Sequence, residues 1–73
     1  MIDNEDVARQ VSDLMVEYTH RLNASIALVR DRGSPEEFHV YRKAVAKIMT
    51  DMLLEIMNPL YARHPNLMPP GFK

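Results

Sequence analysis

The stretch that decides the fold is "RDRGSPEEF", residues 30–38. Gly33 favours the end of a helix, because glycine readily takes the left-handed conformation that closes many helices. Ser34 can cap a second helix, Pro35 fits its first turn, and Glu37 completes a capping box. These independent signals agree, so the stretch predicts two helices joined by a tight turn at Gly33 and Ser34.

Apolar residues recur every three or four positions on both sides of this turn, which is the spacing of one helical face. We expect a first helix over residues 4–32, capped by Asp3 or Asn4, and a second over residues 35–58. The face of the first helix comprises Val7, Val11, Leu14, Met15, Tyr18, Leu22, Ile26 and Val29. The face of the second comprises Phe38, Tyr41, Val45, Ile48, Met49, Met52 and Ile56, followed by Leu60 if the helix continues. No segment alternates with period two, so the sequence predicts an all-α fold, a long antiparallel helical hairpin.

Pro59 interrupts the second helix, because proline lacks an amide proton and its ring clashes with the preceding turn. The helix either ends at Asn58 or kinks there and adds a further turn that reaches residue 63. We therefore expect a hairpin over residues 1–64 and an extended proline-rich tail over residues 65–73. The tail is unusually apolar, and three interpretations stay open: packing on the hairpin, docking to a partner, and disorder.

A hairpin of this length predicts a second copy, because two helices share one seam and do not enclose a core. Two hairpins packed face to face would close a four-helix bundle, so we expect a homodimer. The methionine-rich second helix and the tail are also suited to another protein partner. The predicted contact surface is formed by Met49, Met52, Leu53, Ile56, Met57, Leu60, Tyr61, Leu67, Met68 and Phe72.

Charge is unevenly distributed along the chain, although the formal net charge is only −1. Residues 1–17 carry five acidic side chains and one arginine, whereas residues 18–47 carry six basic and three acidic ones. A dimer with its two loops at opposite ends would lay the acidic segment of one chain near the basic segment of the other.

A metal-binding bundle is the first alternative function. Glu17 and His20 have the Glu-x-x-His spacing that di-iron four-helix bundles use. The second helix, however, places Ile48 and Met49 at the same height and offers no inward carboxylate there. We therefore expect Glu17 to face solvent and to pair with Arg21, and we predict no bound metal or other cofactor.

A weak RNA-binding hairpin dimer is the second alternative. Arg42, Lys43 and Lys47 form a basic line that phosphates can contact. The chain as a whole lacks the basic excess of a dedicated nucleic-acid binder, so nucleic acid is not the expected partner. His39 and His64 are expected to be surface histidines.

The composition excludes several chemical classes. The chain has no cysteine and two glycines, so it offers no disulfide framework, thiolate metal site or glycine-rich phosphate loop. No base and nucleophile pair is evident either, so we predict no enzymatic activity. The first ten residues are acidic and polar, and no apolar stretch is long enough to span a bilayer. We expect a small cytoplasmic interaction or regulatory module, with no membrane association.

Overall fold

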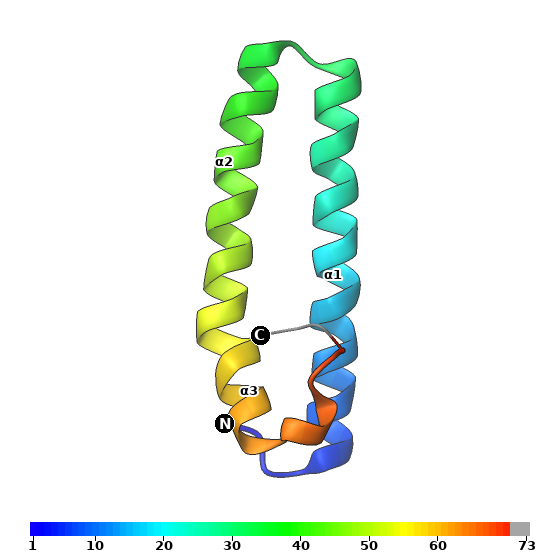
Figure 1. Cartoon of the computed structure of the whole chain (residues 1–73), viewed down its shortest axis with the longest axis vertical. Helices are drawn as coiled ribbons and strands as arrows, with labels where there is room; N and C mark the ends of the chain where they lie inside the picture. The colour runs from blue at the N-terminus through cyan, green and yellow to red at the C-terminus, as the bar shows by residue number, and fades with distance from the viewer. Residues whose placement is uncertain (71–73) are drawn as a thin grey trace.

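Two long antiparallel helices form the body of the protein (Figure 1). The structure, a computed structural model, describes residues 1–70, and these contain helices and turns but no strand. α1 spans Glu5–Arg32 and α2 spans Pro35–Met52. The molecule measures 44 × 20 × 16 Å, and its long dimension matches the length of about 42 Å that a helix of this size has at 1.5 Å per residue. The predicted helical hairpin is therefore confirmed.

The chain continues beyond α2 through three short elements. A π-helical turn, η1, spans Leu53–Met57, and α3 spans Asn58–Arg63. A single 3₁₀ turn, η2, spans Pro65–Leu67 and carries the chain back toward α1. The first residues of the tail therefore form a turn and are not simply extended.

The turn between α1 and α2 is fixed by the capping box that the sequence predicts. The Glu37 amide donates to Ser34 Oγ at 3.1 Å, and the Ser34 amide donates to Glu37 Oε1 at 2.8 Å. The expected left-handed conformation of Gly33 is wrong, because its φ of −95° and ψ of 178° describe extended backbone. Glycine is required there for space: a Cβ atom on Gly33 would lie 2.8 Å from the carbonyl oxygen of Val29.

Pro59 neither ends the second helix nor breaks it. The turn before it widens instead, so that the Asn58 amide donates to the Leu53 carbonyl five residues back. In a regular α-helix the proline ring would clash with the carbonyl of Glu55. A wider π turn gives that ring room, which is why such turns often accompany helix kinks.

The π turn also changes which side chains face α1. In a regular α-helix, side chains about 18 residues apart, or five turns, point in the same direction. If the helix stayed regular after buried Val45, the side chain of Arg63 would therefore also point toward α1. The extra residue rotates everything after it by about 100°. Leu60 and Tyr61 are fully buried as a result, while Arg63 is exposed.

The core lies at the open end of the hairpin, where α3 packs on the start of α1. Leu60 and Tyr61 contact Ala8, and the hydroxyl groups of Tyr61 and Ser12 are hydrogen-bonded at 2.6 Å. Ala8 and Ser12 lie one turn apart, and their small side chains leave room for the larger ones from α3. Both residues lie outside the apolar face predicted for α1, because neither has a large apolar side chain.

The segment after α3 also holds the N-terminal residues. His64 Nε2 lies 2.6 Å from the carbonyl oxygen of Ile2, and the His64 residue is only 8% exposed. The expectation of a surface histidine is therefore wrong, because α3 continues far enough to bring His64 against the other end of the chain. Two exposed contacts reinforce this junction: Arg63 with Asp3 at 3.1 Å, and Asn66 with Glu5 at 3.3 Å.

The substitution Gly33→Ala tests the crowding at the turn. The added methyl group must displace the backbone of Val29, and overpacking of this kind costs about 1–3 kcal/mol. We expect a melting temperature lower by several degrees, measured by circular dichroism. Arg32→Ala, an exposed change in the same turn, is the control and should have little effect. A Gly33→Ala protein that melts with the parent would contradict the crowding.

The substitution Tyr61→Phe tests the buried hydrogen bond in the core. Removing the hydroxyl takes a partner from Ser12, and we expect a loss of about 1 kcal/mol in urea unfolding. Tyr41→Phe is a matched control, because its partner Ser25 also donates to the Leu22 carbonyl at 2.7 Å and so keeps a hydrogen bond. Equal losses of unfolding free energy in the two variants would show that the hydrogen bond to Ser12 stabilises the protein no more than the one to Ser25 does.

Candidate functional site

One side of α1 carries large apolar side chains that its own hairpin leaves about half exposed. They are Val7, Leu14, Tyr18 and Leu28. Val7, Leu14 and Leu28 are separated by multiples of seven residues, a spacing that returns to nearly the same direction on a helix. Part of the apolar face predicted for α1 therefore lies outside the seam with α2.

The matching side of α2 exposes Val40 and Ile48, which are 67% and 50% accessible. Near the loop, a shallow hollow lined by Leu28 and Tyr41 adjoins another lined by Tyr41 and Val40. The exposed side chains of both helices thus share one side of the hairpin. We call this side the open face and define it by Val7, Leu14, Tyr18, Leu28, Val40 and Ile48.

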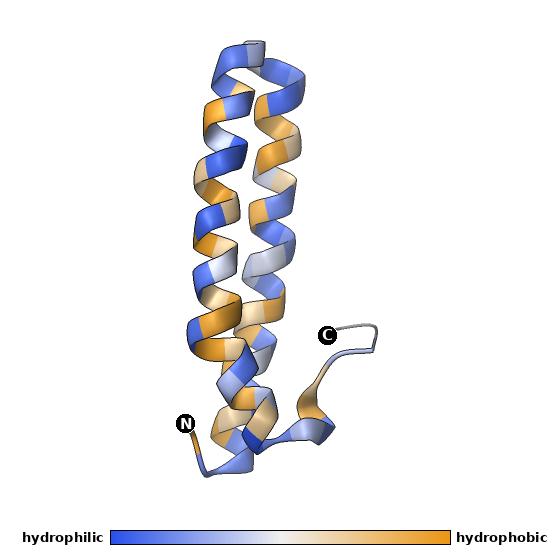
Figure 2. Ribbon diagram, turned by 60° about the vertical axis from the view of Figure 1, so that its left-hand side comes forward, coloured by the Kyte–Doolittle hydropathy of each residue, from blue (hydrophilic) through white to orange (hydrophobic). Residues whose placement is uncertain are grey.

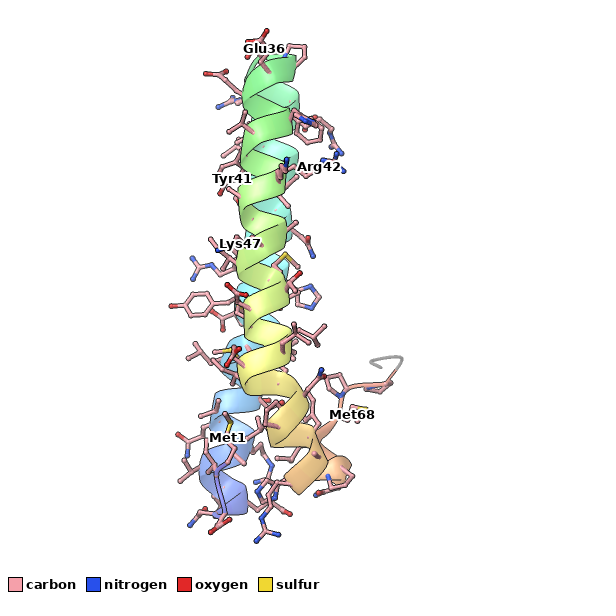
Figure 3. The ribbon with its side chains drawn as sticks, turned by 90° about the vertical axis from the view of Figure 1, so that its left-hand side faces the viewer. Met1, Glu36, Tyr41, Arg42, Lys47 and Met68 are labelled. Atoms are coloured by element: carbon pink, nitrogen blue, oxygen red, sulfur yellow. The ribbon has the colours of Figure 1, made fainter. Side chains whose placement is uncertain are left out.

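The open face and the returning tail lie on different sides of the molecule. In Figure 3, Tyr41 lies on one side of α2, and Met68 lies on the other with the tail. Figure 2 shows apolar residues along the full length of both long helices, well beyond the part near the tail. The tail, as far as Pro70, therefore leaves the open face uncovered.

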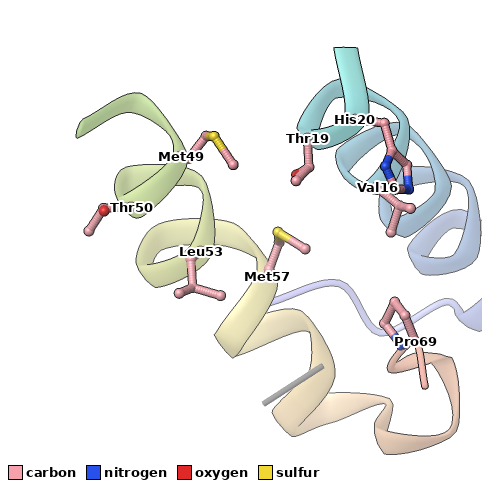
Figure 4. Close-up of a pocket in the computed structure, with 8 residues that line it drawn as sticks. All are labelled: Val16, Thr19, His20, Met49, Thr50, Leu53, Met57 and Pro69. Atoms are coloured by element: carbon pink, nitrogen blue, oxygen red, sulfur yellow. The ribbon is translucent and has the colours of Figure 1, made fainter. Parts of the chain in front are cut away.

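A pocket of about 360 Å³ lies between the helices away from the open face (Figure 4). α1 lines it with Val16, Thr19 and His20. The opposite wall comes from the end of α2 and the π turn, with Met49, Thr50, Leu53 and Met57, and Pro69 of the tail closes one side.

The pocket is apolar at its centre and polar at its edge. The side chains of Met49 and Met57 extend toward α1 in Figure 4. Thr19 donates its hydroxyl proton to the carbonyl of Met15 at 2.9 Å, so its oxygen can still accept a hydrogen bond. Among the described residues of the lining, His20 is ionisable, and none is a carboxylate, lysine or arginine. The arrangement suits an apolar ligand that has few polar groups.

The predicted contact residues differ in their surroundings. Leu60 and Tyr61 are buried in the core. Met49, Leu53 and Met57 line the pocket, and Met57 is also largely buried. The others that the structure describes are partly buried or exposed at the surface: Met52, Ile56, Leu67 and Met68. Phe72 lies outside the described residues.

Glu17 and His20 have different surroundings in the structure. Glu17 is exposed and lies 3.7 Å from Arg21, which confirms the predicted pairing. His20 is turned toward the pocket (Figure 4). Across residues 1–70, no group of three or more histidine, aspartate or glutamate side chains is placed to hold a metal ion.

The predicted basic line is exposed on α2, but one of its members has a local role. The Arg42 guanidinium lies over the Phe38 ring, 5.8 Å from its centre, in a cation–π contact. Lys43, Lys47 and His39 are exposed.

Comparison of the chain with protein-family models, curated proteins and solved structures gave no match. In the described part of the chain, none of the helices is long and apolar enough to cross a membrane. Sequence reasoning missed the pocket, because its shape depends on the π turn and on where the tail returns.

Proposed function

We propose that the protein is a small non-enzymatic interaction or regulatory module, and that it acts as a homodimer joined through the open face. The observation that carries this proposal is the row of half-exposed apolar side chains along both long helices. Apolar patches of this extent on small proteins commonly mark protein interfaces. Two hairpins packed through the open face would form a four-helix bundle.

The distribution of burial supports a second copy as the occupant. Within α1 the buried residues are Ala8 and Ser12, and within α2 the buried residue is Val45. The loop half of the hairpin therefore has a seam but no closed core of its own. A second hairpin would supply the missing layer along the whole length, which a short peptide would not do.

Charge supports an arrangement with the two loops at opposite ends. Such a dimer has a two-fold axis across the helices and lays α2 antiparallel to the partner's α2. With the axis near Lys47, at about mid-height of the open face, Lys43 of one chain would lie near Asp51 of the other. Lys47 would face its own symmetry mate, and its long side chain can keep the charge in water.

The substitution Ile48→Asp tests the interface without removing the fold of the single chain. Ile48 is half exposed in the hairpin, so a carboxylate there can remain hydrated in a monomer, but a dimer would bury it unpaired. We expect light scattering to show a dimer near twice 8.5 kDa for the parent and a helical monomer for the variant.

Ala46→Glu is the matched control, because exposed Ala46 lies two residues away on the other side of α2. It should leave the dimer intact. A parent protein that stays monomeric at high concentration would overturn the homodimer and would leave the open face to a different protein.

A charge exchange between Lys43 and Asp51 tests the orientation. Lys43→Asp should weaken the dimer by juxtaposing two carboxylates, whereas Lys43→Asp combined with Asp51→Lys should restore it. Surface pairs contribute about 0–1 kcal/mol, so we expect up to a few-fold change in the dissociation constant by analytical ultracentrifugation. Additive effects of the two substitutions, with no rescue, would contradict this orientation.

A further inference from the structure

We propose that the pocket between α1 and the π turn binds a small, uncharged, mostly apolar molecule, such as an aromatic ring with one hydrogen-bonding group. Its volume of about 360 Å³ lies at the lower end of the range of small-molecule sites, about 300–1,000 Å³. This size fits a compact ligand of one or two rings.

The lining selects for an uncharged ligand. Its centre is formed by the flexible side chains of Met49 and Met57 together with Leu53 and Val16. Thioether sulfur makes favourable contacts with the edges of aromatic rings, and methionine adapts to ligand shape. Among the described residues, the walls offer neither a fixed positive nor a fixed negative charge to pair with an ion, so burying an ionic group against them would be unfavourable.

Two polar side chains on α1 can bind the hydrogen-bonding group of the ligand. Thr19 and His20 come from neighbouring positions of α1 and lie on the same wall (Figure 4). A hydroxyl or ring N–H of the ligand can reach one of them while its apolar part contacts the methionines. The ligand would therefore bind with its polar end toward α1.

The pocket is built by a local departure from regular helix. Leu53 and Met57 are the first and last residues of the π turn, and both line the pocket. Single π turns within helices occur frequently at functional sites, although the regular α-helix is more stable. In this chain the turn both accommodates Pro59 and brings two apolar side chains to one wall.

The pocket and the proposed dimer interface are separate. None of the residues that line the pocket belongs to the open face. Binding at the pocket therefore does not depend on the homodimer, and failure of one proposal leaves the other testable.

The test uses indole as the uncharged probe and the six methionines as reporters, labelled with ¹³C at their methyl groups for NMR. We expect indole to shift the Met49 and Met57 methyl signals saturably, with a dissociation constant on the order of 1 mM or below. Met1 and Met15, which do not line the pocket, should not respond. Indole-3-carboxylate should bind at least several-fold more weakly, because its charge has no partner.

Val16→Phe should fill the pocket and remove the indole response, whereas Val40→Phe makes the same change on the open face and should retain it. Circular dichroism checks that Val16→Phe still folds. If it does not, Thr50→Phe, at the exposed edge of the pocket, is the second variant that should block indole binding. Equal shifts at all methionines, or an undiminished response in both blocked variants, would overturn the proposal.

Other occupants give different results. A variant that lacks residues 71–73 is the first comparison. If indole shifts the methionine signals only in this variant, the pocket is assigned to the chain's own last residues. Met49 and Met57 signals that move with protein concentration, without indole, would assign it to a second copy. Either result would overturn the proposal that the pocket binds a small molecule. The same titration with Ile48→Asp should be unchanged, which separates the pocket from the dimer.

Discussion

The structure depends on how the second helix accommodates Pro59. A proline in the middle of a helix removes one hydrogen bond and presses its ring against the carbonyl four residues earlier. Here the chain responds by widening the preceding turn, Leu53–Met57, and then continues as α3. The widened turn rotates α3 so that Leu60 and Tyr61 face α1. The core, the position of His64 against Ile2 and one wall of the pocket all follow from that rotation.

The two ends of the hairpin are consequently unlike. At the open end, α3, the returning tail and the N-terminal residues pack together around Tyr61, whose hydroxyl is held by Ser12. Toward the loop, the two helices share a seam that includes the hydrogen bond between Ser25 and Tyr41, with large apolar side chains left outside it. Burial is therefore concentrated at the end of the molecule that holds α3, and the seam near the loop stays partly uncovered.

The two candidate surfaces differ in the chemistry they offer. The open face is long and shallow, as protein interfaces commonly are. The pocket is compact and concave, and it is lined by adaptable methionines. Because the two surfaces lie on different sides of the same two helices, occupation of one does not block the other. In the proposed module, a partner copy and a small molecule would therefore act independently.

The sequence by itself determined the two long helices, the turn between them and the capping box that begins the second. Those features are local: Ser34 and Glu37 act within one turn, and apolar spacing is a property of each helix alone. The sequence also showed that the second helix either ends before Pro59 or continues past it. Only the tertiary structure decided that choice, because the π turn is stabilised by what α3 then contacts. The roles of Ala8 and Ser12 were likewise undecided, since a small side chain becomes part of a core only when a large one, here Tyr61, arrives from a distant segment.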